Sequence, residues 1–158
     1  MITRDRDPLG RPRNARPRDR SGRPLPRGSR NEADDLPDDL DLTPAQTLAY
    51  AQQLLDDGQA FTAHEVFEVA WKRRPNPERD LWQGLAQLAV GLTHLQRGNL
   101  TGAVSLLRRS ADRLATSAPH LAFGVDVAGL ITFSTALADD LAAGVRSAAQ
   151  RRHPRLVG

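Results

Sequence analysis

The sequence predicts an all-α protein: a compact antiparallel bundle of about five helices, with a disordered N-terminal tail. From residue 42 onward, no stretch alternates between apolar and polar residues with period two, and β-branched residues are sparse. Helix caps, prolines and glycines divide this part of the chain into five segments with short turns between them. Short turns favour antiparallel neighbours.

The first two predicted helices have clear boundaries. Thr43 is a favourable N-cap, and Pro44 suits the first helical position. Gly58 ends this helix. The second helix ends before Pro75-Asn76-Pro77, because proline disfavours the helical conformation of the residue before it. The expected bounds are 44–57 and 62–74.

The three later helices also have recognisable ends. Gly98 ends the third helix, Asn99 can cap the fourth, and Asp126 can cap the fifth. Pro119 lies just beyond the end of the fourth helix. The expected bounds are 78–97, 100–117 and 127–143.

Composition separates both ends of the chain from this helical part. Residues 1–30 hold ten Arg, five Pro and three Asp, for a net charge of +7, and residues 31–41 hold six acids and no base. So few apolar side chains cannot offset the entropy of ordering the backbone. We therefore predict a disordered Arg/Pro-rich and then acidic tail over 1–41, a helical domain over 42–145, and a frayed basic C-terminal tail over 146–158.

Several classes of protein are excluded or disfavoured. The chain has no cysteine, which excludes disulfides and thiolate metal sites. No apolar run approaches the roughly 18 residues of a membrane-spanning helix, and the N-terminus lacks the apolar core of a secretory signal. We expect a cytoplasmic protein with no membrane contact. The basic tail could bind nucleic acid weakly, or could be a solvated segment neutralised by its acidic neighbour.

The second predicted helix carries an unusual pair of polar residues. His64 and Glu68 are four residues apart and lie on one side of the helix, with Phe61 and Trp71 flanking them. Glu65 points about 100° away from His64. A His and a Glu at this spacing can hydrogen-bond to each other or hold one metal ion.

The third predicted helix has no charged residue from Leu81 to Gln96. A surface helix usually carries charge, so we predict that this helix lies at the centre of the bundle. Its polar residues form a narrow stripe opposite a leucine stripe, and we expect this polar stripe to be internal. Glycines seven residues apart would let a neighbouring helix approach closely. The polar stripe holds Gln83, Gln87 and His94, and the glycines are Gly84 and Gly91.

One hypothesis joins these residues in a metal site of a hydrolase. His64, Glu68 and His94 would be ligands of a divalent metal (zinc, iron or manganese), and the metal-bound water would be activated for hydrolysis. Glu65 would be the general base, or Glu68 if it is not a ligand. The remaining residues would orient the metal ligands or bind the substrate: Gln83, Gln87 and Trp71.

The alternative hypothesis is a non-catalytic helical interaction module. The segment HEVFE lacks the second histidine of an HExxH zinc motif, and a His–Glu pair with two Gln side chains can satisfy itself as a buried structural network. The partner is then an unknown small molecule or protein. A leucine-rich face on the fourth or fifth helix could also complete a homo-oligomer.

The same residues resemble a known family. The segment AHEVFEVAW followed by LWQGLAQLAVGLTHLQRGNLTGAVSLLRR is similar to the prokaryotic "domain of unknown function 309" family over roughly residues 45–140. The family pattern is an Ala-His-Glu-x-x-Glu-x-x-Trp helix followed by a Gln-Gly-Leu-x-Gln-x-Ala helix. The resemblance implies an all-α bundle in the cytoplasm, and members are often labelled predicted metal-dependent hydrolases.

The family motif can be carried over residue by residue. The motif positions in this chain are His64, Glu65, Glu68, Trp71, Gln83, Gly84 and Gln87. At the position of His94 the family often, but not always, has a polar or aromatic residue.

Overall fold

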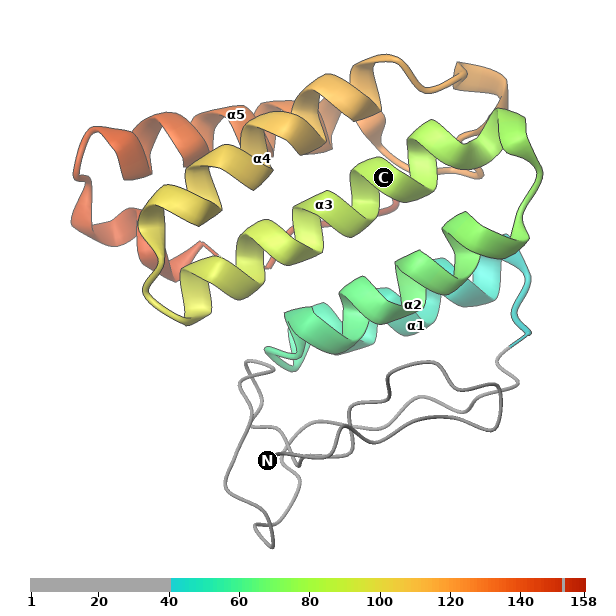
Figure 1. Ribbon diagram of the computed structural model, residues 1–158, viewed down its shortest axis with the longest axis horizontal. Helices are drawn as coiled ribbons and strands as arrows, with labels where there is room; N and C mark the ends of the chain where they lie inside the picture. Colours follow the sequence, from blue (N-terminus) through green and yellow to red (C-terminus); the bar gives the residue numbers. More distant parts are fainter. Residues whose placement is uncertain (1–40, 152) are drawn as a thin grey trace, which may run out of the picture.

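The computed structural model describes residues 41–151 and 153–158, and this part of the chain contains five α-helices. The helices confirm the predicted all-α bundle, and their ends lie within a few residues of the predicted bounds (Figure 1). Three short 3-10 helices lie in the connections. The α-helices are α1 (Pro44–Asp56), α2 (Ala60–Arg73), α3 (Arg79–Gln96), α4 (Leu100–Ala115) and α5 (Val127–Ala142). The 3-10 helices are η1 (Asn76–Glu78), η2 (Pro119–Leu121) and η3 (Arg146–Gln150).

The predicted N-caps form hydrogen bonds in the structure. The Thr43 hydroxyl accepts from the Gln46 backbone N–H at 3.1 Å, and the Gln46 side chain accepts from the Thr43 N–H at 3.0 Å. This reciprocal pair is a capping box. The side chains of Asn99 and Asp126 cap α4 and α5 by accepting one backbone N–H each, from Gly102 at 3.1 Å and from Gly129 at 3.0 Å. These short polar side chains fix where three of the five helices begin.

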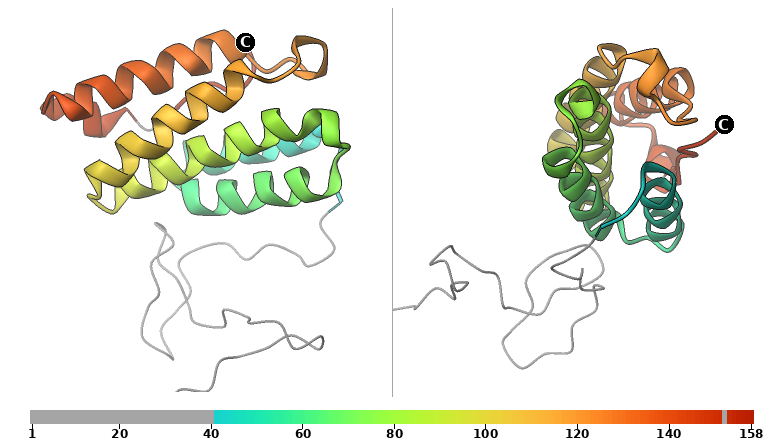
Figure 2. Two further views of the ribbon diagram at one scale, coloured as in Figure 1. Left: turned by 45° about the horizontal axis from the view of Figure 1, so that its top comes forward. Right: turned by 90° about the vertical axis from the view of Figure 1, so that its right-hand side faces the viewer.

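Helix α3 is the middle helix of a layer formed by α2, α3 and α4. Helix α1 packs against α2, and helix α5 packs against α4. Both helices lie on the same face of this layer (Figure 2). The prediction that α3 is central is confirmed, because its leucine stripe is buried in the core shared by all five helices. This stripe comprises Leu81, Leu85, Leu88, Leu92 and Leu95.

Glycines allow α4 to lie close to α3. A Cβ placed on Gly84 would be 2.8 Å from the Leu114 side chain, and one placed on Gly91 would be 3.1 Å from Leu107. The Ser110 hydroxyl of α4 also donates to the Gly84 carbonyl at 2.8 Å. The predicted role of the two glycines in close helix packing is confirmed.

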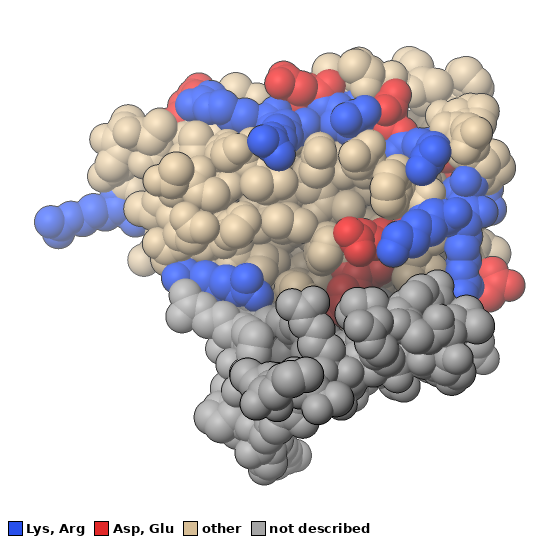
Figure 3. Space-filling view, viewed as in Figure 1, with Lys and Arg blue, Asp and Glu red and all other residues tan. Residues whose placement is uncertain are grey.

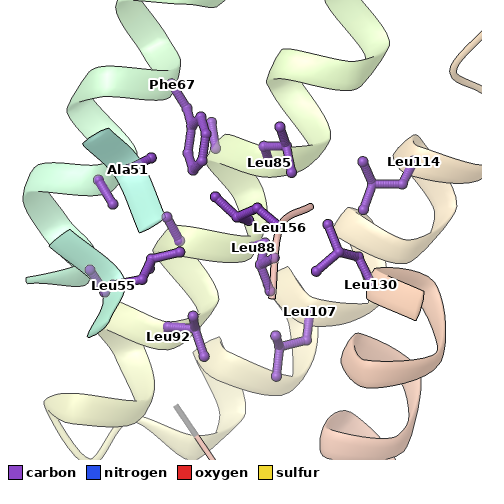
Figure 4. Close-up of a cluster of buried hydrophobic side chains, with 14 of the residues drawn as sticks. Ala51, Leu55, Phe67, Leu85, Leu88, Leu92, Leu107, Leu114, Leu130 and Leu156 are labelled. Atoms are coloured by element: carbon purple, nitrogen blue, oxygen red, sulfur yellow. The ribbon is translucent and has the colours of Figure 1, made fainter. Parts of the chain in front are cut away.

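Residues 153–158 are anchored to the bundle through Leu156, which belongs to the core, so the expectation of frayed C-terminal residues is wrong. Leu156 is fully buried, and it lies among leucines of α3, α4 and α5 and residues of α1 and α2 (Figure 4). Its N–H donates to the Gln52 side chain at 2.8 Å, and its carbonyl accepts from the Asp126 N–H at 2.9 Å. This segment has no periodic signal, because one buried leucine between exposed residues forms no pattern.

Two further expectations concern the molecule as a whole. No helix among the described residues is long and apolar enough to cross a membrane. The predicted disorder of the N-terminal tail and its weak nucleic-acid binding fall on residues 1–40, which lie outside the described residues.

Candidate functional site

His64 and Glu68 form an ion-pair contact on the outer side of α2. The distance from His64 Nε2 to Glu68 Oε1 is 3.0 Å, and the side chains are 18% and 43% exposed. The His64 ring also packs against Phe61, with 5.7 Å between ring centroids. The predicted i, i+4 pair therefore exists at a half-buried position beside an aromatic ring.

Trp71 lies on α2 one helical turn beyond Glu68. The Arg79 guanidinium sits 5.0 Å from the centre of the Trp71 ring, in a cation–π arrangement. The rest of this ring packs on the core, but the indole N–H is buried and has no hydrogen-bond partner within the described part of the chain.

The polar stripe of α3 faces outward, so the expectation of an internal stripe is wrong. Gln83, Gln87, Val90 and His94 are partly exposed, while most of the other residues of α3 are buried. The outer surface along α3 is largely free of charge, and Lys, Arg, Asp and Glu collect toward its margins (Figure 3). Helical periodicity gives the angle between two stripes, but it does not say which stripe faces the core.

The register between α2 and α3 gives the height of their polar residues along the layer, and the Gln87 side chain itself lines a hollow with residues of α4. The Gln96 side chain donates to the Gly58 carbonyl at 2.6 Å, which joins the start of α2 to the end of α3. Since the helices run antiparallel, this register brings Trp71 level with Gln83 and Glu68 level with Gln87. We call this surface the α3 face; it comprises Gln83, Gln87, Val90 and His94 of α3 with His64, Glu68 and Trp71 of α2.

Three buried polar atoms on the α3 face have no hydrogen-bond partner among the described residues. They are His64 Nδ1, Trp71 Nε1 and Gln87 Oε1. An unmade hydrogen bond of a buried group costs about 1–3 kcal/mol, so native proteins retain few such atoms. A self-satisfied network between the two helices would have paired these atoms.

His94 lies against α4 and not beside the His64–Glu68 pair. Its Nδ1 is 3.2 Å from the Asn99 side-chain nitrogen, and a Cβ placed on Gly102 would be 3.0 Å from its ring. Burial lowers the pKa of His94, and the nearby charge of Arg97 lowers it further. The imidazole is therefore neutral at pH 7, and it accepts from Asn99 if its proton is on Nε2.

The described residues meet only part of the predicted metal-ligand set. His64 and Glu68 are together, but the described part of the chain holds no group of three or more His, Cys, Asp or Glu side chains that could bind a metal. A catalytic zinc site usually has three protein ligands. A ligand histidine also usually donates its second N–H to a neighbour, and His64 Nδ1 has no such neighbour among these residues. The residues therefore fit a metal poorly.

Glu65, the predicted general base, lies on the neighbouring side of α2 and is partly exposed. It is adjacent to His64 in sequence but points about 100° away around the helix. Its predicted catalytic role depends on a metal-bound water, so it stays a prediction together with the metal.

Sequence reasoning missed a buried acid that accepts three side-chain hydrogen bonds. Glu78 is 5% exposed and accepts two hydrogen bonds from the Arg74 guanidinium, both at 2.9 Å, and a third from the Trp82 indole at 3.1 Å. The Arg74 hydrogen bonds lower the pKa of Glu78, the Trp82 bond lowers it further, and burial opposes both. The signal was the spacing of four between Arg74, Glu78 and Trp82, which the two prolines between them obscured.

Comparison with known proteins finds similarity in the part of the chain that holds the two motif helices. The chain is 43% identical over 51 residues to the uncharacterized protein YpuF of Bacillus subtilis (strain 168), and this match covers 32% of the chain and 29% of that relative. No solved structure matches the chain. Residues 48–106, which hold both motif helices, match the family described as domain of unknown function (DUF309), so the resemblance seen in the motifs is confirmed over this segment.

Proposed function

We propose that this protein is a non-catalytic helical interaction module, and that the α3 face is the surface that binds its partner. The observation that carries the proposal is the set of three unpartnered buried atoms on this face: His64 Nδ1, Trp71 Nε1 and Gln87 Oε1. These atoms are covered in the isolated chain, so a partner would pair them only once the side chains turn outward, and the new hydrogen bonds would then recover the free energy that the unmade ones cost.

The chemical character of the α3 face supports this proposal. The cores of protein interfaces are depleted of charged residues and enriched in aromatic residues, with Arg common among the residues that dominate binding. Here two aromatic residues of α2, Phe61 and Trp71, are in contact with arginines near the two ends of α3. The Arg97 guanidinium lies 5.7 Å from the Phe61 ring centre, and Arg79 lies over the Trp71 ring.

The length of the stripe favours a helical segment of a partner protein. The rise of an α-helix places Gln83 and His94 about 16 Å apart, which is three turns of a packed helix. Sites for small molecules are concave clefts that enclose most of the ligand. An amphipathic helix lying along α3 would reach polar and apolar positions of the stripe together.

A site-specific photo-cross-linker can test the proposed surface in the cells that produce the full chain. We expect a cross-linker at Gln87 to capture one defined protein, and the Trp71→Ala substitution to abolish the product. A cross-linker at Thr135, an exposed residue of α5, is the matched control and should not give that product. Equal products from both positions, or a product insensitive to Trp71→Ala, would contradict the proposal.

The second candidate function is the metal-dependent hydrolase. The observation that favours it is the 3.0 Å contact of His64 with Glu68, which places two ligand types on one helix with Glu65 next to them. It ranks second because the fit of the described residues to a metal is poor. If a metal is bound, it supplies an activated water, and His64 and Glu68 are the residues that would hold it.

Elemental analysis of the full chain separates the two candidates. The interaction module predicts no stoichiometric zinc, iron or manganese in the wild-type protein and none taken up on titration. Near-stoichiometric metal that disappears in the folded His64→Ala variant would replace the interaction module with the hydrolase.

A further inference from the structure

We infer that the groove between α1 and the start of α5 is a second binding site, which takes an extended peptide carrying one leucine. In the structure, residues 153–158 of the same chain occupy this groove as an extended segment between α1 and α5 (Figure 2). The groove lies on the face of the α2–α3–α4 layer that α1 and α5 cover, so it is separate from the α3 face.

Residues of the groove form hydrogen bonds with the backbone of the bound segment. The Gln52 side-chain amide donates to the Pro154 carbonyl at 2.9 Å and accepts from the Leu156 N–H at 2.8 Å. The Asp126 N–H donates to the Leu156 carbonyl at 2.9 Å, and Val125 and Val157 form an antiparallel bridge. Such main-chain hydrogen bonds hold any extended peptide, whatever its side chains.

A single side-chain pocket supplies selectivity. Leu156 is 0% exposed and points into the core, whereas its neighbours Arg155 and Val157 are exposed. An extended segment alternates its side chains between two sides, so a bound peptide needs one aliphatic residue flanked by residues that face solvent. The pocket is lined by leucines of several helices, including Leu88 and Leu130 (Figure 4).

The groove continues beyond the bound segment. A cavity of about 430 Å³ lies between α1 and the bound segment, and its lining includes Ala45, Leu48, Ala49 and Phe123. Phe123 is 38% exposed and Val157 is 46% exposed beside this cavity. Residues 153–158 leave this apolar surface uncovered, so a longer extended peptide would bury more of it than they do.

The contacts that hold η3 are separate from those that hold the bound segment. Helix η3 has its own anchors: Ala148 is fully buried, and Arg151 just after η3 is paired with Asp140 of α5. Residues 153–158 are held by one buried leucine, Pro154 and the hydrogen bonds of the groove. Segments of this kind open locally before the fold as a whole unfolds.

The test uses the full chain with Leu156→Asp, because a carboxylate in the apolar pocket expels the segment and leaves the groove open. The probe is a synthetic peptide with the sequence of residues 153–158, HPRLVG. We expect it to bind the variant saturably and raise its Tm, and to bind the wild-type chain far more weakly because the wild-type segment competes. Adding Gln52→Ala should weaken peptide binding by about tenfold or more.

A control peptide and a second measurement complete the test. The same peptide with aspartate in place of leucine should not bind. A folded Leu156→Asp variant that does not bind HPRLVG, or that binds both peptides equally, would overturn the inference. If the variant does not fold, hydrogen exchange of the wild-type chain gives the answer: a Leu156 amide that exchanges by local opening, faster than the Leu88 amide, supports the inference, and one that exchanges only with global unfolding overturns it.

Discussion

At the scale of single residues, the buried carboxylate of Glu78 joins the end of α2 to the start of α3. It binds Arg74, the residue that follows α2, and Trp82, which is fully buried in α3. Phe123 stacks on Trp82, with 6.0 Å between ring centroids, so the connection before α5 packs on the same cluster. This one acid therefore sets the turn that places the two motif helices side by side.

We predict that Glu78→Gln destabilises the fold. Hydrogen bonds to charged groups contribute about 1.5–3 kcal/mol each, but Arg74 is about a third exposed and can regain water, so the expected loss is about 1–3 kcal/mol. Denaturant unfolding measures this loss. The matched control is Asp139→Asn, which breaks the exposed contact with Arg108 and should cost less than about 1 kcal/mol. Equal losses of unfolding free energy in Glu78→Gln and Asp139→Asn would contradict the structural role assigned to Glu78.

The lowered pKa of Glu78 also gives a pH dependence. A carboxyl whose pKa is lower in the folded than in the unfolded chain stabilises the fold above the unfolded pKa, which is about 4.3 for Glu. This stability is lost as the pH falls through the folded pKa. The difference in unfolding free energy between wild type and Glu78→Gln should therefore shrink below about pH 4. A difference that does not change with pH would exclude this electrostatic role.

His94 should make the fold sensitive to mild acid. Its pKa is lowered in the folded chain, so the unfolded chain binds more protons as the pH falls below about 6.5, and the fold loses stability there. In His94→Gln this loss should be smaller, because glutamine has no proton to take up. The exposed residue His120 provides the control variant, His120→Gln. Identical pH profiles of unfolding for His94→Gln and wild type would refute the prediction.

At the scale of helices, the contact between α3 and α4 depends on small residues. Alanine favours a helix over glycine by about 1 kcal/mol, so propensity alone predicts that Gly84→Ala stabilises α3. The added methyl would meet Leu114 at 2.8 Å, and the Leu114 backbone nitrogen is only 3.3 Å away. We predict that the clash dominates and that the fold loses about 1–3 kcal/mol.

Gly91→Ala is the graded comparison for this prediction. Its methyl would meet Leu107 at 3.1 Å, a milder overlap, so the loss of unfolding free energy should be smaller than for Gly84→Ala. Thermal unfolding of both variants gives the order. If both variants are more stable than wild type, helix propensity controls this contact and close packing does not.

At the scale of the whole molecule, much of the fold could be predicted from local chemistry. Thr43, Asn99 and Asp126 cap the helices for which they were predicted as caps. Caps can be predicted in this way because a cap depends only on neighbouring residues. The uncharged run from Leu81 to Gln96 also predicted the central position of α3. These signals lie within one helix and need no knowledge of its neighbours.

The features that could not be predicted depend on how helices are placed relative to one another. The stripe with Gln87 and His94 lies opposite the leucines in any arrangement, but only the packing of α2 and α4 shows that it faces outward. For the same reason, the spacing of His64 and Glu68 predicted their contact, whereas the position of His94 against Asn99 and Gly102 could not be predicted. Leu156 was missed because its pocket comes from helices far away in the sequence.

The central claim is that the polar residues of the α3 face serve a partner and not the fold. The unfolding free energy of the double variant Trp71→Phe, Gln87→Met tests it most directly, because these changes remove two unpartnered buried atoms and keep most of the side-chain volume. We predict a value equal to or higher than that of wild type, because no hydrogen bond is lost. A fall of about 3–5 kcal/mol, the cost of breaking a buried polar network, would contradict the account.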